Sequence, residues 1–144
     1  KINGWAPMWS TPSGNSAYVI YVGLNIEIAF FFAVAALLVI KALPADRSLK
    51  ILGLPNRLVI PMMMGLASVF VEVLLNRAGL LVWDNVWWQW PNIWLIIAAY
   101  CLPFLAVAWC HDHLTLKAKT IAAVGLPVLA VICHLVFAAW LSWI

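Results

Sequence analysis

The sequence predicts an all-α integral membrane protein, a small bundle of four transmembrane helices with a Trp-rich loop on its outer side. Of its 144 residues, 67% are hydrophobic and only 9% are charged, whereas a soluble domain is about half apolar and about a quarter charged. Four apolar segments are each long enough, at roughly 20 residues, to cross about 30 Å of hydrocarbon. A spanning segment must satisfy its backbone hydrogen bonds internally, and no long alternating pattern indicates a barrel, so we expect helices.

The chain divides into an N-terminal arm and one transmembrane domain. Residues 1–16 are rich in Pro, Gly, Ser and Trp, which is typical of a non-helical arm, and we expect it to lie on the outer surface. Residues 17–144 form the single four-helix domain. The expected spans cover about residues 17–40, 58–80, 93–110 and 121–143.

The basic residues of the connections predict the orientation. The first connection carries four Lys or Arg against Asp46 alone, and the third carries Lys117 and Lys119, whereas the second has only Arg77 beside Asp84. Short loops rich in Lys and Arg face the cytoplasm. We therefore expect both ends of the chain on the non-cytoplasmic side. The net charge of +3 is spread over helix ends, which excludes a nucleic-acid partner.

Ten Trp residues are present, and five of them lie in the segment WDNVWWQWPNIW of the second connection. These five are Trp83, Trp87, Trp88, Trp90 and Trp94. Indole rings favour the membrane–water interface, which explains a Trp-rich loop without any ligand. That explanation predicts belts on both sides, however, and nine of the ten fall on the outer side in this orientation. A lipid, a hydrophobic pigment or a partner protein that stacks on the outer surface is the alternative.

Three ionisable residues lie inside the expected spans: Glu27, Glu72 and His134. Such residues are costly in hydrocarbon and are candidates for a functional site. Counted from the basic residues that mark the inner edge, all three lie 14 or 15 residues into their spans, about 21–23 Å at ~1.5 Å per residue. They are catalytic candidates at one level of the membrane, or a hydrogen-bonded trio that fixes helix packing.

The helix face around Glu72 contains small and polar residues, including Gly65, Ser68 and Asn76. We expect this face to point into protein rather than lipid. This face leads along the helix toward the Trp-rich loop, which we expect to form a lid over the level of Glu27, Glu72 and His134. Tyr100 lies just above Pro103, whose kink could open a cavity. Asn76, Tyr100 and the five Trp residues of the loop are therefore the predicted partner- or ligand-binding residues.

Cys110, His111, Asp112 and His113 form a weaker candidate, for a metal. In a continuous helix His111 and His113 point ~200° apart and cannot share an ion. We therefore favour a polar helix end over metal ligation, with His111, Asp112 and His113 as the residues that any metal would use.

The leading functional hypothesis is an accessory or structural subunit of a larger membrane assembly, which contacts membrane lipids and other integral membrane subunits. The alternatives are an intramembrane acid–base enzyme that uses Glu27, Glu72 and His134 on a lipid or isoprenoid, and a proton or solute transporter. No phosphate loop or nucleophile elbow is present. Bound lipid or hydrophobic pigment is the cofactor class that the composition allows.

Overall fold

The computed structural model describes residues 9–12, 19–21 and 24–141, and it shows a helical membrane protein. The long helices are α1 (Ile26–Ala42), α2 (Asn56–Arg77), α3 (Ile93–His113) and α4 (Leu116–His134). A short π-helix, η1 (Leu135–Trp140), continues α4. Three of them are long and apolar enough to span a bilayer: Asn56–Arg77, Ile93–His113 and Leu116–Phe137. The fourth, α1, has 17 residues. The structure thus supports an integral membrane protein with three spanning helices.

The helices begin and end at residues that differ from the expected spans. We expected the first span from residue 17, but α1 begins at Ile26, because β2 (Val19–Tyr21) and β3 (Leu24–Asn25) form a short antiparallel hairpin before it. We expected the fourth span from residue 121, but α4 begins at Leu116, where the Thr115 hydroxyl accepts a hydrogen bond from the Ala118 N–H at 3.3 Å. Such a side-chain cap starts a helix independently of hydropathy.

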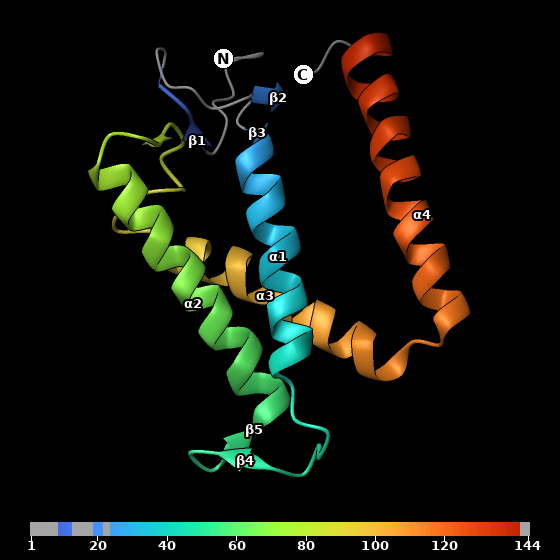
Figure 1. The fold of residues 1–144 in the computed structure, drawn as a ribbon. Helices are drawn as coiled ribbons and strands as arrows, with labels where there is room; N and C mark the ends of the chain where they lie inside the picture. Colours follow the sequence, from blue (N-terminus) through green and yellow to red (C-terminus); the bar gives the residue numbers. More distant parts are fainter. Residues whose placement is uncertain (1–8, 13–18, 22–23, 142–144) are drawn as a thin grey trace.

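The most extensive helix contact is between α2 and α3. The two backbones approach closely at Gly65, where a Cβ atom would lie 2.6 Å from the Cys101 Sγ and 2.8 Å from the Cys101 Cα. Small residues permit such contacts between membrane helices. The α1 helix lies beside α2 (Figure 1) and packs on α3 through Ala35 and Val39, which meet Phe104 and Ala108.

Among the described residues, three short strand pairs lie outside the helices. In addition to the β2–β3 hairpin, β4 (Lys50–Ile51) pairs with β5 (Leu54–Pro55) below α1 and α2. The third pair joins β1 (Trp9–Ser10) to β6 (Val82–Trp83). Because β1 belongs to the N-terminal arm and β6 to the connection between α2 and α3, this pair attaches the described part of the arm to the Trp-rich loop.

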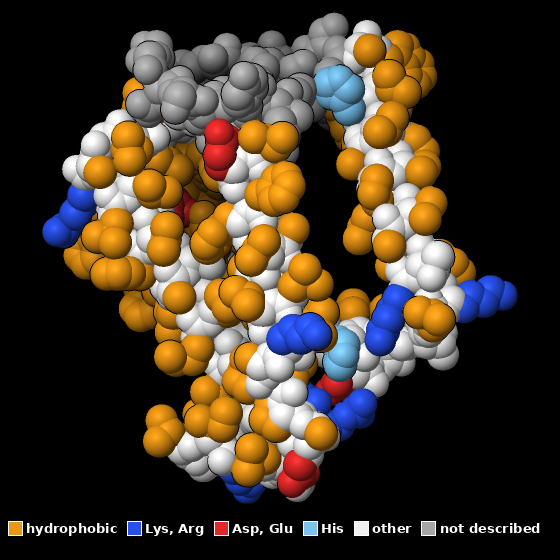
Figure 2. Space-filling view, in the orientation of Figure 1, with side chains coloured by type: hydrophobic (Ala, Val, Ile, Leu, Met, Phe, Trp, Pro, Cys, Tyr) orange, Lys and Arg blue, Asp and Glu red, His pale blue; other side chains and the backbone are white. Residues whose placement is uncertain are grey.

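The α4 helix stands apart from the other helices (Figure 1). Among the described elements, α4 makes only isolated contacts apart from those with η1, which continues it, and none of the best 18-residue window within Leu116–Phe137 is buried. Hydrophobic side chains cover the long walls of the molecule, whereas most Lys and Arg on the visible face gather at one end, around the α1–α2 connection and the start of α4 (Figure 2). This separation of charge from apolar surface is typical of a protein embedded in lipid.

Candidate functional site

The Glu72 carboxyl lies inside the protein near the C-terminal end of α2. The residue is 3% exposed, and it sits among the buried cluster formed by Val69, Trp88, Ile96 and Tyr100. One turn below it, Ser68 is also buried and donates a hydrogen bond from its hydroxyl to the Met64 carbonyl at 2.9 Å. The small, polar face of α2 therefore points into protein, as its sequence predicted.

Two indole groups from the Trp-rich loop hold this carboxyl. The Nε1 atoms of Trp83 and Trp88 each donate a hydrogen bond to Glu72 Oε1, both at 2.8 Å. Within the described residues, the other oxygen, Oε2, is buried and has no hydrogen-bond partner. Tyr100 on α3 belongs to the same buried cluster, and its ring centroid lies 6.4 Å from that of Trp88. The site is therefore a buried carboxyl group with one oxygen fixed by two indoles of the loop.

The loop is shaped by side-chain amides as well as by the indoles. Asn76 Nδ2 donates to the Leu81 carbonyl at 3.0 Å, Asn85 Oδ1 accepts from the Trp87 N–H at 2.9 Å, and Asn92 Nδ2 donates to the Val86 carbonyl at 3.0 Å. Asn side chains commonly hold turns in this way, by replacing backbone partners. These bonds fix where the loop returns over α2, so Trp83 and Trp88 can reach Glu72.

Trp9 of the N-terminal arm completes the aromatic cover. It is the register partner of Trp83 in the β1–β6 pair, and its ring centroid lies 5.4 Å from that of Trp88. The Trp9 Nε1 is buried and has no hydrogen-bond partner among the described residues. We call the cover formed by Trp9, Trp83 and Trp88 the Trp lid. The sequence did not associate Trp9 with the loop, because no local pattern indicates which strand a two-residue segment will join.

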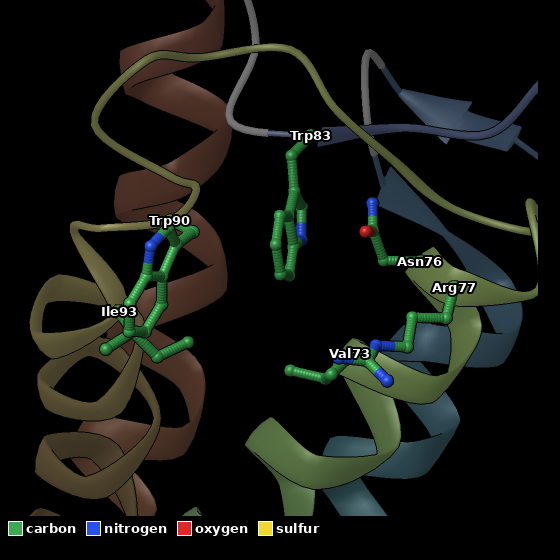
Figure 3. Close-up of a pocket in the computed structure, with 6 residues that line it drawn as sticks. All are labelled: Val73, Asn76, Arg77, Trp83, Trp90 and Ile93. Carbon is green, nitrogen blue, oxygen red and sulfur yellow. The ribbon is translucent and has the colours of Figure 1, made fainter.

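An apolar pocket lies beside the Trp lid, between the end of α2 and the start of α3. Its volume is about 350 Å³, and its lining residues are Val73, Asn76, Arg77, Trp83, Trp90 and Ile93. Figure 3 shows Val73, Asn76 and Arg77 on α2 facing Trp90 and Ile93, with Trp83 above the space between them. Trp83 is shared, because it lines the pocket and also donates to Glu72. Glu72 itself does not line the pocket, so acid–base chemistry on a ligand there would require Trp83 to move.

The other two ionisable candidates lie elsewhere. Glu27 is in the first turn of α1 and is exposed, and His134 is in the last turn of α4 and is exposed. The described hydrogen bonds of the Glu72 carboxyl come only from the Trp-rich loop. The structure therefore brings Glu72, Tyr100, Trp83 and Trp88 together, and it does not bring Glu27 or His134 to them.

The predicted loop residues also divide into two groups. Trp83 and Trp88 turn inward, whereas Trp87 and Trp90 in the loop and Trp94 in the first turn of α3 are 66%, 77% and 76% exposed. Of these three, Trp90 lines the pocket. Large exposed indoles at this level suit a membrane interface, so the loop combines interfacial residues with residues that build the site.

A second polar cluster, which we call the inner cluster, lies at the opposite end of α2, and the sequence did not predict it as a unit. Arg57 donates from Nε to Asp112 Oδ2 at 2.8 Å and from one amino group to the Pro44 carbonyl at 2.6 Å. Asn56 is fully buried and donates to the Asp46 and Leu49 carbonyls at 3.0 and 2.6 Å. These bonds join the α1–α2 connection to the last turn of α3. Asn56, Arg57 and Asp112 were visible in the sequence as polar residues at helix ends. Arg57 and Asp112 are 55 residues apart, however, so the sequence did not indicate that they pair.

The candidate metal residues belong to this end of the molecule. The Nδ1 of His111 lies 3.1 Å from Asp112 Oδ1, whereas the His113 ring stacks on Trp109 with centroids 5.3 Å apart. Helix α3 continues through His113, so the two imidazoles diverge as expected. Within the described residues, no group of three His, Cys, Asp or Glu side chains could hold an ion. Asp112 acts as the anchor of the inner cluster.

Asp46 lies in the same connection, outside the spans, and has its own partners. The Ser48 hydroxyl and backbone N–H donate to Asp46 Oδ1 at 2.7 and 2.8 Å. These hydrogen bonds to the charged form hold the pKa of the Asp46 carboxyl below its ordinary value. The charge of Asp46 thus stabilises the turn that leads into β4.

Comparison with known proteins places this architecture in a family. Residues 1–139 match the model of a family described as "Uncharacterized membrane protein family". A protein of Archaeoglobus fulgidus, described as "Uncharacterized protein", is 37% identical over 141 residues, which cover 97% of this chain and 66% of that protein. The chain thus spans slightly less than two thirds of the length of the relative it matches. No solved structure matches the chain.

Proposed function

We propose that this chain, which belongs to the uncharacterized membrane protein family whose model it matches, binds a hydrophobic ligand of lipid or pigment type from the membrane, in the outer pocket beside the Trp lid. The pocket is the observation that carries this proposal. Its volume of about 350 Å³ falls in the range of about 300–1,000 Å³ that small-molecule sites occupy. Its lining is largely apolar, with two indole rings available for stacking.

Glu72 supports the proposal because it gives the pocket a fixed wall. A carboxyl group buried among apolar side chains is costly, and here it serves to hold Trp83 and Trp88 in place. A binding site whose walls are held before the ligand arrives loses less entropy on binding. A function for the buried Glu72 carboxyl is therefore to hold Trp83 in the position that a ligand in the pocket requires.

The orientation proposed for the chain puts the pocket at the outer leaflet. At the end opposite the pocket, Arg47 and Lys50 lie in the α1–α2 connection, Arg57 lies in the first turn of α2, and Lys117 and Lys119 lie in the first turn of α4. By the distribution of Lys and Arg, we infer that this end faces the cytoplasm. With 17 residues, α1 is at the lower limit of about 17–25 for a spanning helix. We count it as a fourth span because it lies beside α2 and packs on α3.

Tryptophan fluorescence tests the proposal, because Trp83 and Trp90 line the pocket. The probe is a medium-chain alcohol with a terminal bromine atom, which quenches nearby indoles, added to protein in nanodiscs of zwitterionic lipid. Val73→Phe fills the pocket, and Leu74→Phe makes the same kind of change on a side chain that is 49% exposed. We expect saturable quenching in the wild type and in Leu74→Phe, and an affinity about tenfold weaker in Val73→Phe. Equal quenching in all three proteins would show that the probe binds elsewhere and would refute the proposal.

A second candidate function, a subunit of a larger membrane assembly, is favoured by α4. Apart from isolated contacts, this helix leaves its apolar surface uncovered by α1, α2 and α3. It carries small residues one turn apart at Ala118, Ala122 and Gly125, and a Cβ on Gly125 would meet no atom within 4 Å. Small residues allow another helix to approach closely. Native mass spectrometry after mild detergent extraction tests this: the assembly predicts additional subunits, and a species of 16.0 kDa without any protein partner would contradict it.

A further inference from the structure

The pocket has one strongly charged residue at its edge, Arg77. It lies in the last turn of α2, on the same wall as Val73 and Asn76 (Figure 3). The side chain is exposed, and within the described part of the chain it makes no hydrogen bond or ion pair. Its donors are therefore uncommitted.

Two other polar groups on the pocket-lining side chains are already engaged within the protein. Asn76 Nδ2 donates to the Leu81 carbonyl at 3.0 Å, and Trp83 Nε1 donates to Glu72 at 2.8 Å. The carbonyls at the end of α2 are also occupied, because the backbone N–H groups of Ala78, Gly79 and Leu80 donate to them at 2.9–3.0 Å. Among the residues that line the pocket, Arg77 is thus the charged one, and its donors remain available at the edge of a largely apolar surface.

We propose that the ligand is a single-chain amphiphile with an anionic head group, a carboxylate or a phosphate monoester, which Arg77 binds while the chain lies between Trp83 and Trp90. This inference rests on the proposed function and specifies its ligand class. A guanidinium group suits such heads because it can donate two parallel hydrogen bonds to one carboxylate or phosphate. A pocket of about 350 Å³ is near the lower end of the range for small-molecule sites, so it accommodates one chain rather than the two of a diacyl lipid.

A matched pair of probes tests the head group. The bromo-terminated alcohol is compared with the bromo-terminated fatty acid of the same chain length, which is kept ionised by a pH well above its pKa. The part of the quenching that does not saturate with probe concentration is subtracted for each probe. In the wild type we expect the acid to bind roughly tenfold more tightly than the alcohol, as for a charge-assisted hydrogen-bonded pair. Arg77→Gln should abolish this preference, and Arg77→Lys should retain part of it. Lys117→Gln, at the opposite end, controls for net charge and should leave the preference unchanged.

The outcomes separate this inference from the proposed function. If acid and alcohol bind equally to the wild type, or if Arg77→Gln keeps the preference, the anionic head group is refuted while ligand binding stands. If Val73→Phe weakens the binding of neither the acid nor the alcohol, both the anionic head group and ligand binding in the pocket are refuted. To test whether the ligand has one acyl chain or two, the affinity of the neutral alcohol is measured again in nanodiscs of phosphatidylglycerol, an anionic diacyl lipid. Unchanged alcohol affinity supports a single-chain ligand, and a loss of about tenfold or more would show that a diacyl anionic lipid occupies the pocket.

Discussion

The Trp83 indole nitrogen donates to Glu72 Oε1 over 2.8 Å, and the same indole ring forms a wall of the outer pocket. One side chain therefore connects a carboxyl group buried inside the protein to a surface that a membrane ligand can reach. Because Trp88 donates to the same oxygen at 2.8 Å, removing the carboxyl would release two indoles at once.

Replacing Glu72 should distinguish its role as an acceptor from its charge. Glu72→Ala leaves two buried indole N–H groups without an acceptor, and each such group costs about 1–3 kcal/mol. We therefore expect a free energy of unfolding lower by roughly 2–6 kcal/mol, measured by denaturant titration in mixed micelles. Glu72→Gln retains an acceptor oxygen and should lose less than half as much. Equal stability of Glu72→Ala and the wild type would show that the hydrogen bonds to the indoles do not form.

Gly65 should tolerate no larger side chain. An added Cβ would lie 2.8 Å from the Cys101 Cα, a backbone atom that cannot move aside without shifting α3. We expect Gly65→Ala to lower the free energy of unfolding by about 1–3 kcal/mol, as overpacking does. Gly125→Ala is the matched control, since nothing lies within 4 Å of its Cβ. If both variants are equally stable, α2 and α3 do not approach each other at Gly65.

The ion pair of Arg57 and Asp112 should couple the α1–α2 connection to α3. The Asp112 side chain is 3% exposed and that of Arg57 is 21% exposed, but Arg47 Nε also lies 3.6 Å from Asp112 Oδ2, so loss of Arg57 should cost less than the ~3–5 kcal/mol expected for a fully buried pair with no other partner. A double-mutant cycle with Arg57→Gln and Asp112→Asn should give a coupling free energy of about 0.5–3 kcal/mol. Arg57→Gln should be the more damaging, because Arg57 also donates to the Pro44 carbonyl. Lys50→Gln, at an exposed position, should change stability little, and additive effects of the pair would refute the coupling.

Single introduced cysteines should report the proposed orientation. Leu52 is 96% exposed at the tip of the β4–β5 hairpin, and Val86 is 64% exposed in the Trp-rich loop. A membrane-impermeant maleimide added to intact cells should label Val86→Cys, and it should label Leu52→Cys only after permeabilisation. The wild type gives the background from its three native Cys residues. The opposite pattern would reverse the orientation and place the pocket in the cytoplasmic leaflet.

The sequence was sufficient for the features that depend on local composition. Hydropathy predicted the helices α2 and α3 closely, and the small, polar face around Glu72 predicted that this carboxyl lies in protein. The idea of a lid over Glu72 also came from the sequence, because the helical face that contains Glu72 leads to the Trp-rich loop. Each of these inferences uses residues within a few turns of one another.

Features that depend on long-range contact were beyond the sequence. The comparison of depths placed Glu27 and His134 level with Glu72, but depth along separate helices does not determine whether those helices touch, and α4 stands apart. The pairing of Trp9 with Trp83 and the contact of Arg57 with Asp112 join residues 74 and 55 positions apart. The hydrophobic segment before Ile26 also resembled a span, because strand and helix residues are equally apolar in that stretch.

The molecules that the protein retains from its own membrane test the central claim most directly. Wild-type protein, Val73→Phe and Leu74→Phe would be purified in mild detergent, extracted with organic solvent and compared by mass spectrometry. A ligand held beside Glu72 and the Trp lid predicts one hydrophobic species, in a fixed ratio to protein, in the wild type and in Leu74→Phe, and its loss from Val73→Phe. The same mixture of bulk lipids from all three proteins, with no species in fixed ratio, would contradict the claim that the outer pocket is a binding site.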